Sequence, residues 1–132
     1  MKNVSASKPK KNSQAIERDS RYHRLFALKS VEFAKRVLPF FEKERPDDDR
    51  PRQAIEAIKA WALGRRELGM VEVRKLSLAS HAAARASKSD AARFAARAAG
   101  HAVAVWHVPT HAMAVPWYAC KALAASKVKA RK

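Results

Sequence analysis

Alanine is the feature of this sequence that most restricts how the chain can fold. Twenty-eight of the 132 residues are alanine, whereas aromatic residues make up 8% and glycine occurs three times. Alanine has the highest helix propensity, and strands need the β-branched and aromatic side chains that are scarce here. No stretch alternates polar and apolar residues for long enough to form a sheet. The sequence therefore predicts an all-α protein.

Apolar residues at three- and four-residue spacing predict a compact bundle of about five helices. Asp19 or Ser20 can cap the first helix, and Pro51 and Gly64 suit the start and the end of the second. The expected helices cover about residues 20–45, 50–63, 68–86, 91–108 and 107–125. Pro109 either kinks one long helix or separates two.

These helices predict a single domain over residues 19–125, between a disordered basic tail at 1–18 and a basic tail at 126–132. The N-terminal stretch "MKNVSASKPKKNSQ" has no apolar run of the kind that export requires. The single cysteine, Cys120, excludes an intrachain disulfide, and its small-residue surroundings predict a buried, reduced thiol. We therefore expect a cytoplasmic protein.

Residues 101–125 are long enough to cross a membrane but carry three histidines, Lys121 and two prolines among many alanines. Such a composition gives a weak drive for membrane insertion. We interpret the segment as a central buried helix and expect no membrane partner.

Positive charge dominates the chain, with 28 lysine and arginine residues, 12 acidic residues and a net charge of +16. After Glu72 the only acidic residue is Asp90, against eleven lysine and arginine residues. Such a field favours acidic partners, including nucleic acid. Arg93 and Arg97 lie one turn apart on an expected helix and Arg85 precedes them, so these three are candidate partner contacts. No nucleic-acid-reading motif accompanies them, so nucleic-acid binding rests on charge alone.

His107 and His111 are separated by one helical turn, a spacing that can place two imidazoles on one metal ion. No acidic residue lies near them, and a third ligand would have to come from His81 on another helix. Metal binding through His107 and His111 is therefore the weaker interpretation, and no cofactor is expected.

A structural role for the histidines is the stronger interpretation. Pro109 and Pro116 each remove a helix donor, which leaves the carbonyl groups of Val105 and Ala112 in need of partners. Histidine side chains can supply such hydrogen bonds. We expect a polar core formed by these residues: His81, His101, His107, His111 and Tyr118.

The sequence also argues against an enzyme. No histidine is spaced to lie beside Cys120, no nearby acid could orient a base, and the C-terminal half lacks paired carboxylates. A phosphate-binding glycine loop cannot be built from Gly64, Gly69 and Gly100. We therefore predict a protein that binds rather than catalyses.

Three runs of the sequence carry a resemblance to a known family: "RVLPFFEKERPDDDRPRQAIEAIKAWALG", "LASHAAARA" and "AARFAARAAGHAVAVWHVPTHAMAVPWYACKAL". Over about residues 24–125 the chain resembles the bacterial family of putative immunity proteins, small all-helical proteins linked to polymorphic toxin systems. The resemblance implies a protein that binds and blocks a cognate toxin. It supplies no defined binding residues.

The positive charge distinguishes this chain from immunity proteins that cover the basic site of a nuclease, which are often acidic. The leading hypothesis is an inhibitor that occludes a toxin with an acidic face and is steered to it by charge. A nucleic-acid-associated helical protein is the first alternative, and a metal-binding protein is the second. The oligomeric state is left open.

Overall fold

The computed structural model describes the backbone of residues 19–131 and the side chains of residues 19–128. These described residues form five α-helices and one short 3-10 helix: α2 (Arg21–Glu44), α3 (Arg50–Ala62), α4 (Met70–Ala86), α5 (Asp90–Ala104), η1 (Pro109–Met113) and α6 (Ala114–Arg131). The predicted all-α fold is confirmed. The tail expected at 1–18 lies outside the described residues.

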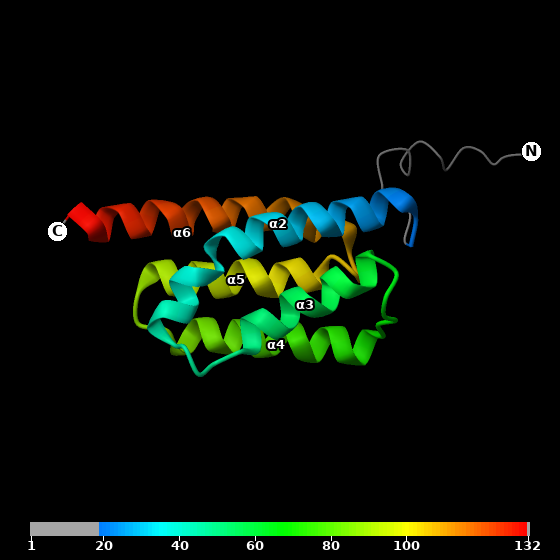
Figure 1. The fold of residues 1–132 in the computed structure, drawn as a ribbon, viewed down its shortest axis with the longest axis horizontal. Helices are drawn as coiled ribbons and strands as arrows, with labels where there is room; N and C mark the ends of the chain where they lie inside the picture. Colours follow the sequence, from blue (N-terminus) through cyan, green and yellow to red (C-terminus); the bar gives the residue numbers. More distant parts are fainter. Residues whose placement is uncertain (1–18, 132) are drawn as a thin grey trace, which may run out of the picture.

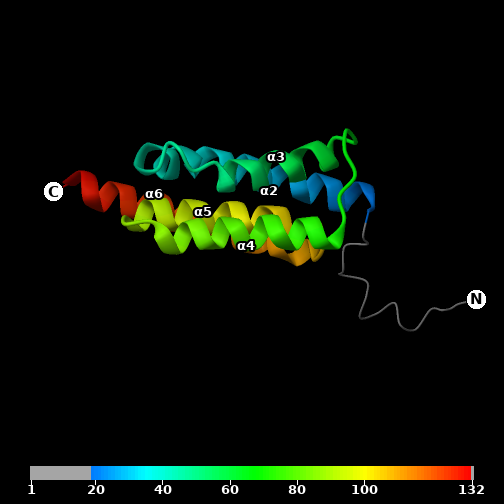
Figure 2. The same ribbon diagram turned by 90° about the horizontal axis from the view of Figure 1, so that it is seen from below.

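The helices form two layers, with α2 and α3 lying over α4, α5 and α6 (Figures 1 and 2). Within the second layer α5 occupies the middle, since it packs against α4 on one side and α6 on the other. From the first layer, α2 packs against α5 and α6, and α3 packs against α4 and α5. Among the described residues, α5 is therefore the one helix that contacts all the others.

Alanine explains this central position of α5. The buried residues of α5 are all small, apart from Val103: Ala91, Ala92, Ala95, Ala96, Ala98, Ala99, Gly100 and Ala102. Side chains of this size let neighbouring helix axes approach to ~8 Å. Larger residues of the first layer, including Phe41, Ile58 and Trp61, fill the space between the layers.

Local signals in the sequence explain most of the helix starts. The hydroxyl of Ser20 accepts a hydrogen bond from the backbone N–H of His23, and Ser89 does the same for Ala92. Pro51 lies in the first turn of α3. Gly64 follows α3 with φ of 76°, the left-handed conformation that glycine adopts without strain.

The segment around Pro109 separates two helices rather than bending one. α5 ends at Ala104, whereas the sequence predicted a helix to about residue 108. Proline disfavours helical geometry at the preceding residue, and Val108 is extended with φ of −129° and ψ of 105°. The chain then forms η1 and turns into α6, so residues 107–125 are not one helix.

The last helix also differs from the prediction at its end. Residues 126–131, expected to form a tail, continue α6, whose last turns extend past the neighbouring helices (Figure 1). Cys120 on α6 is exposed, so the prediction of a buried thiol is wrong. Small neighbours in the sequence did not imply burial because Cys120 lies on the side of α6 away from Val115, Ala119 and Ala122.

Within the part of the chain that the structure describes, none of the helices combines the length and the apolarity that a membrane span requires.

Candidate functional site

The three candidate arginines lie in different environments on α4 and α5. Arg85 is exposed on α4, whereas Arg93 and Arg97 are half-buried one turn apart on α5. Arg93 forms an ion pair with Asp90 at the start of the same helix. The guanidinium of Arg97 instead donates to Nδ1 of His81 on α4, at 2.8 Å. The two neighbours on α5 thus differ in whether their charge is balanced.

Around Arg97 the structure gathers residues from α4, α5, η1 and α6. The His81 and His101 rings meet edge to face, with centroids 5.1 Å apart. Nδ1 of His101 lies 3.1 Å from Nδ1 of His111, within hydrogen-bond distance. The ring of His101 also stacks on Tyr118, with an interplanar angle of 13°. His81, His101, His111 and Tyr118, four of the five expected core residues, therefore come together, although each is half-buried rather than fully enclosed.

Glycine at position 100 makes room for His81. A Cβ atom at Gly100 would lie 2.7 Å from Nε2 of His81, closer than a methyl group can approach. Beside this contact, the hydroxyl of Ser77 donates to the carbonyl oxygen of Gly100 at 3.0 Å. The close approach of α4 and α5 at Gly100 holds the His81 ring against α5, one turn from Arg97.

Aromatic residues continue the surface from Tyr118 across α6. Phe94 on α5 lies 6.3 Å from Tyr118 between ring centroids, and Trp117 meets Tyr118 edge to face at 4.8 Å. Nζ of Lys121 lies 4.9 Å from the centroid of Phe94 and 4.5 Å from that of Trp117. A cation held above two rings in this way is attracted by their electron-rich faces.

We call this connected surface the α5–α6 face and define it by ten residues: His81, Arg93, Phe94, Arg97, His101, His111, Trp117, Tyr118, Lys121 and Arg85 at its edge. Trp117 is 56% exposed, so an aromatic ring is available to a partner at the surface. Tryptophan, tyrosine and arginine are the residues that most often carry binding energy at protein interfaces.

The histidines of the α5–α6 face are neutral at neutral pH. Burial, followed by the unfavourable interaction of a protonated His81 ring with His101 and Arg97, lowers the pKa of His81 to about 4. Burial also lowers the pKa of His101 and His111, and each is further lowered by a neighbouring histidine. None of these rings therefore supplies or neutralises charge at pH 7, and the unbalanced positive charge of the face comes from Arg97 and Lys121.

His107 is placed differently from the other histidines. It is exposed beyond the end of α5, so it does not contribute to the polar core that the sequence predicted. His111 pairs with His101 instead of His107, because the break at Pro109 removes the helical register between them. Among the described residues, no group of three histidine, cysteine, aspartate or glutamate side chains is arranged to hold a metal ion.

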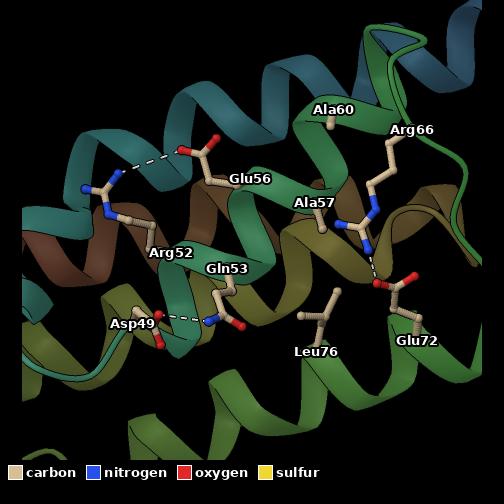
Figure 3. Close-up of a pocket in the computed structure, with 9 residues that line it drawn as sticks. All are labelled: Asp49, Arg52, Gln53, Glu56, Ala57, Ala60, Arg66, Glu72 and Leu76. Atoms are coloured by element: carbon tan, nitrogen blue, oxygen red, sulfur yellow. Dashed lines mark hydrogen bonds and ion pairs between the residues drawn. The ribbon is translucent and has the colours of Figure 1, made fainter.

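A groove between α3 and α4 is lined mainly by charged and polar side chains (Figure 3). Arg52 pairs with Glu56 and with Glu42, and Arg66 pairs with Glu72. The side chain of Gln53 donates to Asp49 at 2.8 Å. Both arginines of this groove are thus already paired with carboxylates, in contrast to Arg97.

Sequence reasoning found the charges of the α5–α6 face but missed its aromatic half. Phe94, Trp117 and Lys121 come from two helices, and only the packing of α5 on α6 brings them together. The stretch from Trp117 to Lys121 did contain a signal, since a tryptophan and a lysine four residues apart share one side of a helix.

The geometry defines a two-layer helical domain with a basic and aromatic outer face. A family model described as Imm-5 like putative immunity protein matches residues 16–132 of the chain. The chain belongs to this family. Comparison with curated proteins and with solved structures gave no match.

Proposed function

We propose that this protein is a non-enzymatic immunity protein that binds and neutralises a cognate bacterial toxin in the cytoplasm of its producer. Membership of the immunity family is the observation that carries the proposal. The family supports a protective role, and protection of the producing cell requires the inhibitor to meet the toxin where the toxin acts.

The α5–α6 face is the surface that we assign to the toxin. It offers an exposed indole at Trp117, a half-buried phenol at Tyr118 and a cation at Lys121. Side chains of these types form binding hot spots when a partner covers them and excludes water. The surface is also positively charged. The described chain after Glu72 contains a single acidic residue, Asp90, and that residue is paired with Arg93.

The proposed partner surface is acidic. A positive potential accelerates encounter with an acidic surface and disfavours basic ones, so it supports selection of a partner as well as rapid binding. Inhibition would be steric, because α5 and α6 would cover the toxin surface that binds this face.

The proposal is tested by capturing partners from a native-host lysate, followed by a high-salt wash and mass spectrometry. A protein retained by the wild type is then expressed alone and together with the immunity protein. We expect expression alone to stop growth and co-expression to restore it. Absence of any growth-inhibiting partner would contradict the immunity function.

The role of the face is tested with Trp117→Ala/Lys121→Glu, matched with Val71→Ala/Lys75→Glu at exposed positions of α4. The first variant should lose capture and growth rescue, and the second should retain both. If the two variants behave alike, the α5–α6 face is not the toxin-binding surface.

A further inference from the structure

Arg97 is the exception among the half-buried arginines of the described chain. Arg24, Arg45, Arg50 and Arg93 share its degree of exposure, and each of these four pairs with an aspartate. No carboxylate within residues 19–128 lies within salt-bridge distance of Arg97, whose side chain is hydrogen-bonded only to His81 in this part of the chain. A guanidinium removed from water without a counter-charge is costly.

The hydrogen bond to His81 does not balance this charge. A guanidinium can only donate, so Nδ1 of His81 accepts and cannot carry a proton at the same time. His81 is therefore held neutral, in agreement with a pKa that burial lowers to about 4. The guanidinium has five N–H groups, and the bond to His81 occupies one of them.

The surroundings of Arg97 add no negative charge either. His81 on α4 is hydrogen-bonded to Arg97, and His101 on α5, whose pKa burial lowers, is close enough for the charge of Arg97 to lower that pKa further. The neighbours of these two rings include Arg85 on α4, His111 on η1 and Tyr118 on α6, none of which is a carboxylate. Asp90 is engaged with Arg93, three residues along the helix. The site is thus complete except for an anion.

We infer that Arg97 is the anchor for a carboxylate of the partner protein, held by the guanidinium beside His81 and His101. This inference rests on the proposed function, since it names the chemical group that the toxin presents to the α5–α6 face. Arginine and a carboxylate can form two parallel hydrogen bonds, which set orientation as well as strength. A lysine at position 97 would supply the charge without this fork.

His81 and Gly100 act here as positioning residues. The ring of His81 occupies the space that a side chain at position 100 would take, and its Nδ1 orients the guanidinium of Arg97. A guanidinium oriented before binding loses less conformational entropy when the carboxylate arrives. In the free protein, the charge of Arg97 remains unbalanced by any carboxylate of residues 19–128.

The first experiment uses the free protein and needs no toxin. The arginine Nε–Hε signals of ¹⁵N-labelled protein are followed by NMR during titration with short oligoglutamate, with oligothymidylate of matched charge, and with sodium chloride. We expect a saturating shift of the Arg97 signal with oligoglutamate and a much smaller change at Arg93, whose carboxylate partner is already present. Equal responses of Arg97 to oligoglutamate and chloride, or preferential saturation by oligothymidylate, would overturn the assignment.

The second experiment compares Arg97→Gln with Arg52→Gln in the full chain, because Arg52 lies on α3, outside the α5–α6 face, and pairs with Glu42. Binding of the captured toxin should weaken about tenfold or more for Arg97→Gln, the loss typical of an interface anchor. Arg52→Gln should change the affinity less than about threefold, as expected for a paired arginine outside the binding surface. Arg97→Lys should recover only part of the affinity. Tight toxin binding with no preference between the two glutamine variants would refute the anchor while leaving the immunity function in place.

A thermal melt separates an anchor from a structural arginine. Because Arg97 is unbalanced in the free protein, Arg97→Gln should leave Tm unchanged or raise it. A Tm well below that of Arg52→Gln would show that Arg97 supports the fold, and would contradict the inference.

Discussion

The Nε2 atom of His23 lies 2.7 Å from the carbonyl oxygen of Val105, a contact between residues 82 positions apart. Nδ1 of the same ring accepts a hydrogen bond from the backbone N–H of Asp19 at 2.8 Å, so the proton is on Nε2 and the ring donates to Val105. The side chain of His23 is fully buried and its ring also meets Trp61. The start of α2 is thereby joined to the end of α5.

Replacing His23 should destabilise the fold. In His23→Leu, the buried carbonyl of Val105 loses its donor, and leaving such a group unsatisfied costs about 2 kcal/mol. We expect the free energy of unfolding in urea to fall by about that amount. His107→Leu is the control, because His107 is exposed and its replacement should stay within about 0.5 kcal/mol. Equal losses in the two variants would contradict the role of the His23–Val105 bond.

This contact illustrates what the sequence could and could not predict. Pro109 correctly indicated that the carbonyl of Val105 needs a donor from outside its own helix. The donor was expected among the histidines near Pro109, but it is His23 of the first helix. Sequence spacing predicts neighbours within a helix, whereas a contact across the bundle depends on how α2 crosses α5.

Local chemistry was the more reliable guide. Ser20, Pro51 and Gly64 occur where the sequence placed them, because a cap or a stop depends on a few adjacent residues. Of the candidate site, the charges of Arg85, Arg93 and Arg97 were visible in the sequence. The absence of a carboxylate beside Arg97 became evident only from the structure, which places Asp90 on Arg93.

Gly100→Ala should destabilise the wild-type protein but stabilise the His81→Ala variant. In the wild type, Gly100→Ala brings a methyl group to 2.7 Å from His81, so we expect a loss of about 1–3 kcal/mol from overpacking. In His81→Ala the clash is absent, and alanine in a helix should instead stabilise by up to about 1 kcal/mol relative to glycine. Chemical denaturation of the wild type, the two single variants and the double variant gives the coupling free energy between positions 81 and 100. The same effect of Gly100→Ala in both backgrounds would show that His81 is not the residue that excludes a side chain here.

Stability should decrease when the pH falls from about 6.5 towards 4. The folded protein lowers the pKa of His81 to about 4 from an ordinary value of 6.5, and those of His101 and His111 move in the same direction. The unfolded chain therefore takes up protons first in this range, which favours unfolding. The contribution of these neutral histidines to the free energy of unfolding is fully present above about pH 6.5 and is lost as the pH falls towards 4.

The check on this pH dependence is a series of thermal melts from pH 7.5 to 4.5, with His81→Asn alongside the wild type. The variant should show a flatter curve because it lacks the most strongly shifted group. Asp48 does not produce the same window, because hydrogen bonds from Arg50 lower its pKa to about 2 and its contribution to stability is lost at more acidic pH. A wild-type Tm that is constant over the series would contradict the prediction.

Glu44 joins the end of α2 to the start of α5 and should be important for stability. Its carboxylate accepts hydrogen bonds from the backbone N–H groups of Lys88 and Ser89, at 2.7 and 3.0 Å, and from the Ser89 hydroxyl at 2.8 Å. Burial raises the pKa of Glu44, but these hydrogen bonds outweigh it and hold the pKa below its usual range. Glu44→Ala should lower the free energy of unfolding by about 1.5–3 kcal/mol, the usual worth of hydrogen bonds to a charged group.

Glu42→Ala is the matched control, two residues earlier on α2. Glu42 pairs with Arg52 at the surface, where an ion pair contributes about 0–1 kcal/mol and is screened by salt. Urea denaturation at low and high salt should therefore distinguish the two variants, with a salt-dependent loss only for Glu42→Ala. A smaller loss for Glu44→Ala than for Glu42→Ala would rule out the link between α2 and α5.

The central position of α5 limits how proteins of this design can acquire new partners. Most positions on this helix are enclosed by other helices, so a larger residue there displaces a neighbour. The positions of Arg93, Phe94, Arg97 and His101 are only half-buried, so this restriction is weaker there. Sequence divergence on α5 is therefore easiest along this strip of four side chains, where it can change the surface without a change of fold.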